Sequence, residues 1–161
     1  MNIRLGTLAD KEAVLALYRA CAAKIDSCWT EEYPNEEFLC IDIDNRWLYV
    51  AQNDIEIVGT VSLMPTDDIE DIGLPFSGSE NVCVLTRLCV SPELQGHGNG
   101  AALLALAEYQ ACQNDARWMH LLCDQLNRKA MALYLRSGYT EVGRPTLYGC
   151  DFIAYEKRLT L

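Results

Sequence analysis

A run of alternating glycines between an apolar strand and an apolar helix constrains this chain more than any other feature. The stretch VSPELQGHGNGAALL, residues 90–104, passes through a proline turn into Gly96, Gly98 and Gly100 and then into the helix. Glycine tolerates positive φ and lets the backbone approach a ligand closely. Successive amides in such a loop, with the unpaired amides of the first helical turn, form an anion site. The segment therefore predicts a loop that binds phosphate or pyrophosphate through its backbone.

Two widespread phosphate loops have to be compared with this one. A nucleotide-hydrolase loop ends in Gly-Lys-Ser/Thr, but Gly100 is followed by two alanines, which excludes that loop. The dinucleotide fingerprint G-x-G-x-x-G/A is formally matched by residues 96–101. In that fold, however, the glycines directly follow the first strand of a parallel unit, whereas here residues 91–95 intervene and only residues 102–161 remain for the rest of the sheet. A nicotinamide-dependent oxidoreductase is kept as an alternative.

Hydrophobic periodicity predicts strands that first pair locally and then alternate with helices. This order predicts an α/β (α+β) chain with a mixed sheet and helices on its faces. The chain has no internal repeat or long linker, so we expect one domain over residues 1–161. The predicted strands are 2–6, 47–52, 57–64, 82–90, 118–124, 139–143 and 149–158, and the predicted helices are 7–21, 36–43, 100–113 and 128–137.

The composition narrows the class of protein. Thirteen Lys and Arg against 23 Asp and Glu give a net charge of −10, which disfavours nucleic acid as a partner. No apolar run approaches the roughly 18 residues of a membrane span, and the N-terminus does not resemble a secretory signal, so we expect a soluble, cytoplasmic protein. The eight cysteines are scattered and are predicted to be reduced, mostly buried thiols. His97 and His120 lack ligand-spaced partners, so no metal site is expected.

A second motif follows the glycine loop. Asn127, Ala130 and Tyr134 stand at i, i+3 and i+7 on one face of a predicted helix, and Gly138 is placed to end it. This pattern is similar to the downstream helix motif of the GNAT family of N-acetyltransferases. Residues 95–100, QGHGNG, match that family's Gln/Arg-x-x-Gly-x-Gly/Ala loop. The two motifs, in this order with a strand between them, make the chain resemble the GNAT family.

The resemblance implies a fold, a cofactor and a reaction. The fold is a central mixed, mostly antiparallel twisted sheet of six to seven strands flanked by helices on both faces. The donor is acetyl-CoA or a related acyl-CoA, and the acceptor is a primary amine that attacks the thioester directly in a ternary complex. The implied cofactor-binding residues are Leu88, Cys89, Val90, Gln95, Gly96, His97, Gly98, Asn99, Gly100, Ala101 and Asn127.

The resemblance also implies catalytic roles. Tyr134 is the general acid, since a phenol with a pKa of about 10 is protonated at neutral pH and can donate to the leaving thiolate. It can equally pack the helix on the sheet, and Asn127 can equally cap the helix. Many family members carry a carboxylate on the strand before the loop, but this strand offers only Thr86 and Arg87. The base is therefore left open between ordered water and a carboxylate of the loop 67–71, such as Glu70.

The acceptor is not encoded in any motif. Acidic residues in the segments 29–37 and 67–71, with Trp29 and Tyr33, are placed to attract a cationic amine by charge and cation–π contact. A solvated acidic surface explains the same charges. Two further expectations stay open: an acyl-CoA sensor without turnover is an alternative function, and a homodimer is a possible assembly by family resemblance.

Overall fold

The computed structural model describes residues 1–160 apart from 24–27 and 55. The chain divides into two compact units, each of which is described by itself. Unit 1 comprises Met1–Leu63 and Arg87–Leu106, and unit 2 comprises Met64–Thr86 and Ala107–Leu161.

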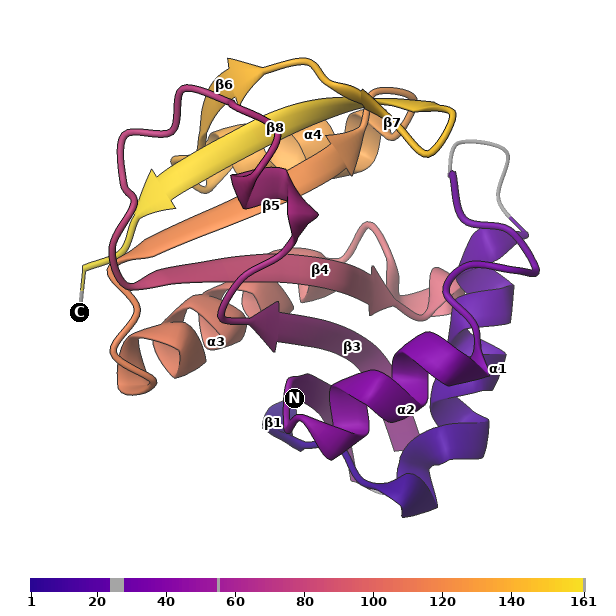
Figure 1. Cartoon of the computed structure of the whole chain (residues 1–161). Helices are drawn as coiled ribbons and strands as arrows, with labels where there is room; N and C mark the ends of the chain where they lie inside the picture. The colour runs from indigo at the N-terminus through magenta and orange to yellow at the C-terminus, as the bar shows by residue number, and fades with distance from the viewer. Residues whose placement is uncertain (24–27, 55, 161) are drawn as a thin grey trace. The chain divides into compact units, whose positions relative to one another are not determined.

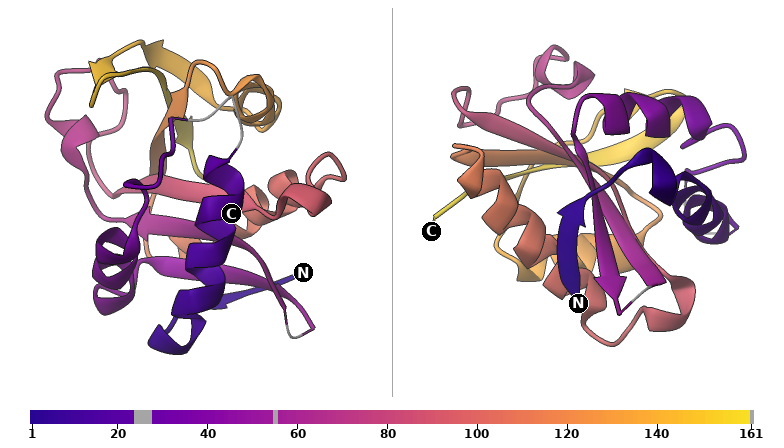
Figure 2. Two further views of the ribbon diagram at one scale, coloured as in Figure 1. Left: turned by 90° about the vertical axis from the view of Figure 1, so that its right-hand side faces the viewer. Right: turned by 90° about the horizontal axis from the view of Figure 1, so that it is seen from below.

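Unit 1 combines antiparallel strands with two packed helices (Figures 1 and 2). Strand β1 pairs with β2 and β2 pairs with β3, both antiparallel, and β3 neighbours β4. The elements are β1 (Asn2–Leu5), η1 (Leu8–Asp10), α1 (Lys11–Ala22), α2 (Glu36–Asp44), β2 (Leu48–Asn53), β3 (Glu56–Met64), the end of β4 (Val82–Val90), η3 (Pro92–Leu94) and the start of α3 (Asn99–Gln113).

Helices cover both faces of the strands of unit 1. Helices α1 and α2 pack on β2 through a buried apolar cluster that includes Tyr18, Leu39 and Val50. On the opposite face, a Cβ at Gly59 of β3 would lie 3.0 Å from the Leu103 side chain, so glycine lets α3 approach closely. Because side chains alternate between the two faces along a strand and both faces of β3 are covered, β3 carries apolar residues on both faces.

The entry to α1 is fixed by a charged network. Arg4 on β1 donates to both carboxylate oxygens of Asp10 at 2.8 Å, and the Thr7 amide donates to the same carboxylate at 2.8 Å. The Arg4 guanidinium, followed by the Thr7 hydrogen bonds, lowers the pKa of Asp10 from 3.8 to about 2. Thr7 and Asp10, three residues apart, thus form a capping box at the start of η1, which precedes the helix.

Substituting Asp10→Asn tests this network through its pH dependence. A carboxyl whose pKa is lowered on folding stabilises the protein above its unfolded pKa and loses that effect as pH falls through the folded pKa. We expect the variant to be about 1–2 kcal/mol less stable at pH 7, with the difference shrinking between pH 4 and pH 2. Urea unfolding across this range measures it. A difference that does not change with pH would contradict the prediction, and Glu36→Gln, which removes the exposed Lys11–Glu36 pair, is the low-impact control.

Unit 2 is built on the C-terminal strands. The start of β4 runs parallel to β5 over Val82–Val84, and β8 pairs antiparallel with β5, β6 and β7. Helix α4 lies against this sheet (Figure 1). Its Tyr134 ring lies 5.9 Å from the ring of Tyr155 on β8, centroid to centroid. The elements are η2 (Asp68–Glu70), β5 (Trp118–Asp124), the end of α3, α4 (Arg128–Arg136), β6 (Thr140–Gly143), β7 (Thr146–Leu147) and β8 (Cys150–Arg158).

The predicted order of elements is confirmed, with β4 and β5 matching their expected bounds. The described strands number eight and not six to seven, because the two-residue β7 joins β8. Among the described strand pairs only β4 and β5 are parallel, which argues against the parallel dinucleotide-binding unit. No disulfide bond joins any of the eight cysteines, all of which lie in the described residues, and four of them are buried. Within the described residues, no helix has both the length and the apolar character needed to span a membrane.

Candidate active site

The glycine loop, residues 95–101, belongs to unit 1 and leads from η3 into α3. Gly96 and Gly98 have φ of +82° and +84°, a region that residues with a Cβ rarely adopt. A Cβ built at either position would meet nothing within 4 Å. The glycines are therefore required by the backbone conformation and by the open space before them, not by close packing inside the protein.

This loop presents unpaired amides. The Ala102 amide donates to Gly98 O at 3.0 Å and is the first to join the hydrogen bonding of α3. In the part of the chain that the structure describes, we find no acceptor for the backbone amides of residues 96–101. The N-terminal end of the 15-residue helix α3 adds partial positive charge at the same place. A phosphate or pyrophosphate is the kind of group that satisfies such donors.

Side chains of the loop bind backbone carbonyls within the loop and just before it. Gln95 Nε2 donates to Val90 O and Asn99 Nδ2 donates to Leu94 O, both at 2.8 Å. His97 Nδ1 lies 3.0 Å from Gln95 O. These contacts hold the loop in shape. The Gln95 amide donates to Pro92 O at 3.4 Å, and cofactor binding by Gln95, His97 and Asn99 stays a prediction.

Residues 88–90 end strand β4 directly before the loop. Arg87, which precedes them, has a φ of +50°, a backbone conformation that residues with a Cβ rarely adopt. On one edge the chain stays paired with β3, because the Ser91 amide donates to Val58 O at 2.8 Å. The bond from Gln95 to Val90 O then ties the loop to the strand. Hydrogen bonds therefore link the predicted cofactor residues of the strand to those of the loop, all within unit 1.

Cys89 lies in this strand and is a neutral thiol. Its Sγ is 3.2 Å from the Thr60 hydroxyl, and its side chain is buried. Burial raises the pKa of the Cys89 thiol well above its ordinary value. Since the thiolate is the nucleophilic form, Cys89 is poorly suited to accept an acyl group itself.

A buried ion pair beside the strand was missed by the sequence reasoning. Arg87 Nε and Nη2 donate to the two carboxylate oxygens of Asp42 on α2 at 2.7 and 2.6 Å, and neither side chain is more than 6% exposed. The Ser62 hydroxyl donates to the same carboxylate. A buried arginine in a mostly apolar strand needs such a partner because an unpaired buried charge is costly. That rule could have predicted a partner, but not its position 45 residues away.

The two predicted acceptor contacts pack inside unit 1. Trp29 lies edge-on to Tyr18 with ring centroids 5.5 Å apart, and Tyr33 lies edge-on to Phe38 at 5.0 Å. The Tyr33 hydroxyl accepts a hydrogen bond from Arg87 Nη1 at 3.3 Å. In the structure, Tyr33 thus contacts a cationic side chain of the protein itself, that of Arg87. Contact of Trp29 and Tyr33 with a substrate amine stays a prediction.

Tyr134 lies on α4 in unit 2 among other aromatic rings. It is 5% exposed, with ring centroids 5.5 Å from Tyr139 and 5.9 Å from Tyr155. Its hydroxyl has no hydrogen-bond partner among the described residues, and it is not one of the fully enclosed polar atoms. Burial raises the pKa of this phenol above its ordinary value of 10, so Tyr134 keeps its proton at neutral pH. The ring packs, and the hydroxyl is left available as a donor.

Asn127 caps the same helix. Its side-chain oxygen accepts from the Ala130 amide at 3.1 Å, as expected of an N-cap asparagine. The capping interpretation of Asn127 is confirmed. Capping occupies Oδ1 and leaves the Nδ2 group, a hydrogen-bond donor, for the predicted contact with the cofactor.

Glu70, the suggested base, closes η2 in unit 2 and is not a free carboxylate. Its Oε1 lies 2.7 Å from Nδ1 of His120 on β5, and its side chain is 22% exposed. His120 is fully buried, so one oxygen of Glu70 is held by an interior residue while the side chain still reaches solvent. The sequence reasoning treated His120 only as a possible metal ligand and missed this pairing.

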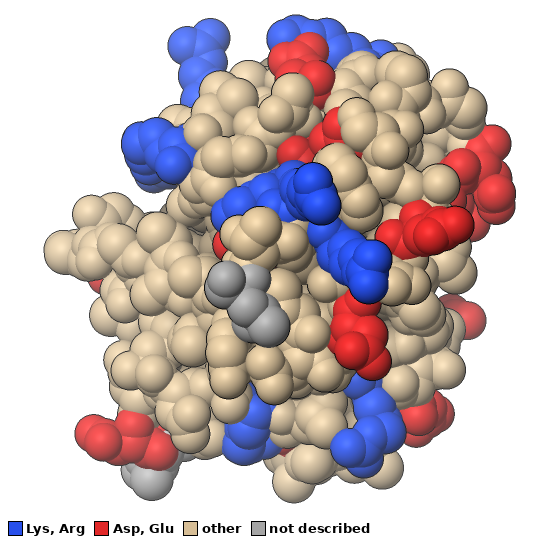
Figure 3. Space-filling view, turned by 90° about the vertical axis from the view of Figure 1, so that its left-hand side faces the viewer, with Lys and Arg blue, Asp and Glu red and all other residues tan. Residues whose placement is uncertain are grey.

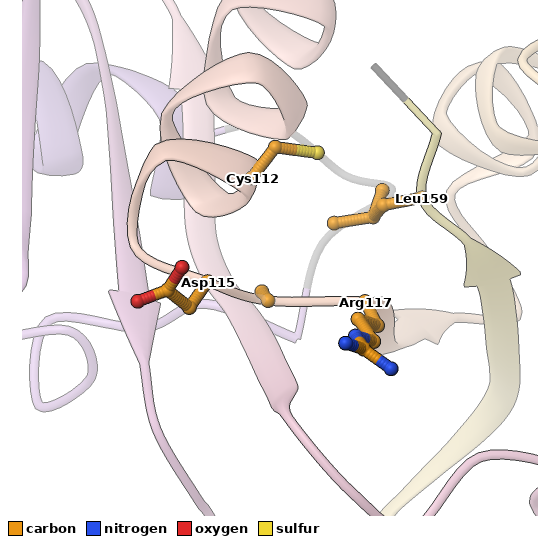
Figure 4. A pocket seen from close by; sticks show the side chains of 5 residues that line it. Cys112, Asp115, Arg117 and Leu159 are labelled. Carbon is orange, nitrogen blue, oxygen red and sulfur yellow. The ribbon is translucent and has the colours of Figure 1, made fainter.

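None of the predicted site residues lines the surface hollow described in unit 2. A shallow hollow of about 230 Å³ in unit 2 is lined by Cys112, Asp115, Ala116, Arg117 and Leu159, with the Cys112 thiol and the Leu159 side chain on opposite sides (Figure 4). On the face shown in Figure 3, Lys and Arg are interspersed with Asp and Glu. Within the described chain, no group of three or more His, Cys, Asp or Glu side chains is arranged to hold a metal ion.

Comparison with known proteins assigns the chain to a family. A model described as the acetyltransferase (GNAT) family matches residues 5–139. The uncharacterized N-acetyltransferase YhfO of Bacillus subtilis is 29% identical over 145 residues, 88% of this chain and 91% of that protein.

Solved structures have the same fold. A ribosomal-protein-alanine N-acetyltransferase from Brucella melitensis is 25% identical, with a TM-score of 0.76 over 99% of this chain and 100% of its own. The structure of yncA from Salmonella typhimurium with its cofactor acetyl-CoA has 19% identity and a TM-score of 0.76 over 100% of this chain and 95% of its own. Because the family model covers most of the chain and includes both motifs, the protein belongs to the acetyltransferase (GNAT) family.

Proposed function

We propose that the protein transfers an acetyl group from acetyl-CoA to a primary amine of a small molecule or a peptide. The observation that carries the proposal is the run of backbone amides at residues 96–101, which have no acceptor within the described chain and follow two glycines at positive φ. These neutral donors at a helix N-terminus fit the diphosphate of coenzyme A without a lysine. The similarity to yncA, which was solved with acetyl-CoA, supports the same cofactor.

The backbone of one strand segment and one side chain would complete cofactor binding. The backbone of residues 88–90 would pair with the pantetheine arm, and an amide there would stabilise the oxyanion of the thioester carbonyl. Asn127 Nδ2 would donate to the same arm. We propose that units 1 and 2, which the family model spans, act as a single catalytic domain over residues 1–161.

The chemistry follows from direct attack by the amine. The amine nitrogen bonds to the acetyl carbon, the carbon–sulfur bond breaks, and the sulfur leaves as a thiolate that takes the Tyr134 proton. The new amide nitrogen then loses a proton, and Tyr134 regains one from solvent. The neutral thiol of Cys89 favours this route over an acyl-cysteine intermediate. An alkylamine has a pKa of about 10, so a base must first remove its proton. Glu70, directly or through water, is the proposed base.

For the acceptor we propose only a chemical class, a primary amine. The Brucella relative is named for acetylating an alanine of a ribosomal protein, which supports a peptide amino group. Trp29 and Tyr33, from the acidic segment 29–37, remain the proposed acceptor contacts. Because Arg87 is neutralised by Asp42, it does not oppose the approach of a cationic amine.

Thiol release from acetyl-CoA with a panel of amines, amino acids and peptides tests the function. We expect turnover with at least one acceptor class and none with NAD(H) as cofactor. Coenzyme A at a hundredfold excess over its dissociation constant should stabilise the protein by about 2.7 kcal/mol, read as a rise in Tm. Stabilisation by coenzyme A without turnover on any acceptor would indicate a sensor, and stabilisation by NAD(H) alone would indicate an oxidoreductase.

A further inference from the structure

A buried imidazole in unit 2 lies between two carboxylates. His120 of β5 is 0% exposed, and its ring stacks on Phe76 with centroids 3.9 Å apart and planes 6° from parallel. Its Nδ1 lies 2.7 Å from Glu70 Oε1, and its Nε2 lies 4.0 Å from Glu156 Oε2. The ring is thus fixed in position and orientation by packing and by one short hydrogen bond.

The second carboxylate is itself held in place. The Ser77 amide donates to Glu156 Oε2 and the Ser77 hydroxyl donates to Oε1, both at 2.7 Å. Among the described residues His120 Nε2 has no hydrogen-bond partner. With Glu156 satisfied by Ser77, the one side-chain hydrogen bond of His120 in the structure is the bond to Glu70.

We infer that His120 is a positioning residue for Glu70, a role that rests on the proposed function of Glu70 as the base. The Nδ1–H group donates to Oε1 and holds the carboxylate at one orientation. The second oxygen of this partly exposed side chain has no partner in the described chain and is the one presented to a substrate proton. An ionised carboxylate with one oxygen fixed loses less rotational freedom when it accepts a proton from the amine.

The charged surroundings of the ring are consistent with this role. The titratable groups that face His120 are Glu70 from η2 and Glu156 from β8, and the loop before β4 contributes the neutral Phe76 and Ser77. A hydrogen bond to the Glu70 carboxylate fixes the proton on Nδ1 when the imidazole is neutral. The inference therefore predicts one tautomer, with Nε2 unprotonated.

Two matched substitutions separate positioning from packing. In His120→Asn the amide nitrogen comes close to the Nδ1 position, whereas in His120→Gln it comes close to the Nε2 position. We expect the Gln variant to lower kcat on the order of 10-fold with an unchanged KM for acetyl-CoA, and the Asn variant to recover most of that loss. Glu70→Gln should lower kcat at least as much and remove the acid limb of the pH–rate profile. Equal kcat for both His120 variants and the native protein, at similar Tm, would overturn the inference.

Nitrogen-15 NMR of the imidazoles tests the pairing without any activity. The chain has two histidines, so the signal that persists in His97→Asn belongs to His120. We expect a proton on Nδ1, and a shift of that signal in Glu70→Gln. A proton on Nε2 instead, or no response to Glu70→Gln, would refute the pairing. A native protein that shows the expected signal but transfers no acetyl group would refute the proposed function, whereas an active enzyme indifferent to His120→Gln would refute positioning.

Discussion

Gly98→Val is expected to raise the dissociation constant of coenzyme A by about 1000-fold or more. The Cβ at this position projects into space where no protein atom lies within 4 Å, which is where the diphosphate is proposed to sit. Each hydrogen bond to a charged group contributes about 1.5–3 kcal/mol, so losing two of them already corresponds to this change in affinity. Titration calorimetry measures it directly.

The same substitution also strains the backbone, and a matched control separates the two effects. Gly149 has a φ of +75° and likewise no atom within 4 Å of its Cβ position, but it lies in the turn between β7 and β8. Gly149→Val should carry a comparable backbone cost of roughly 1–3 kcal/mol and bind coenzyme A normally. If both variants lost affinity equally, the effect would be one of stability, and the glycine loop would not be the phosphate site.

Tyr134→Phe is expected to lower kcat by about 100- to 10,000-fold, the range for loss of a general acid, with little change in the affinity for coenzyme A. The hydroxyl has no hydrogen-bond partner among the described residues, so removing it breaks no internal bond and should leave Tm nearly unchanged. Burial raises the pKa of the phenol, so the native enzyme should keep its acid protonated, and remain active, beyond pH 9.

Tyr139→Phe is the matched control for the acid. Tyr139 is buried beside Tyr134 in the same aromatic cluster, but its hydroxyl donates to Met119 Sδ at 2.9 Å. It should therefore alter stability more than turnover. A Tyr134→Phe enzyme with native kcat, or one that loses coenzyme A affinity and turnover together, would show that the ring at 134 only packs.

Local sequence patterns predicted most of the fold. Strands β4 and β5 were placed with their observed bounds because each is a short apolar run between turn signals. The glycine loop could be predicted because a positive φ, or a close approach of the backbone to a ligand, leaves few alternatives to glycine. The helix cap at Asn127 could also be predicted, because such caps depend only on residues within one helical turn.

Long-range pairings could not be predicted in the same way. Arg87 is hydrogen-bonded to Asp42, 45 residues away in the sequence, and Glu70 to His120, 50 residues away. No local sequence pattern links either pair. The side chains of Gln95 and Asn99 hydrogen-bond to backbone carbonyls and so stabilise the loop. These bonds depend on the path of the backbone, which residue spacing does not specify. The acceptor contacts are the hardest to predict, because aromatic residues such as Trp29 and Tyr33 pack against the protein as readily as against a ligand.

The most direct measurement is a crystal structure of the protein with acetyl-CoA. We predict phosphate oxygens about 3 Å from the amides of residues 96–101, the pantetheine arm along residues 88–90, and the thioester sulfur within hydrogen-bond reach of the Tyr134 hydroxyl. A complex in which the diphosphate binds elsewhere while these amides face only water, or in which the sulfur points away from Tyr134, would contradict the account.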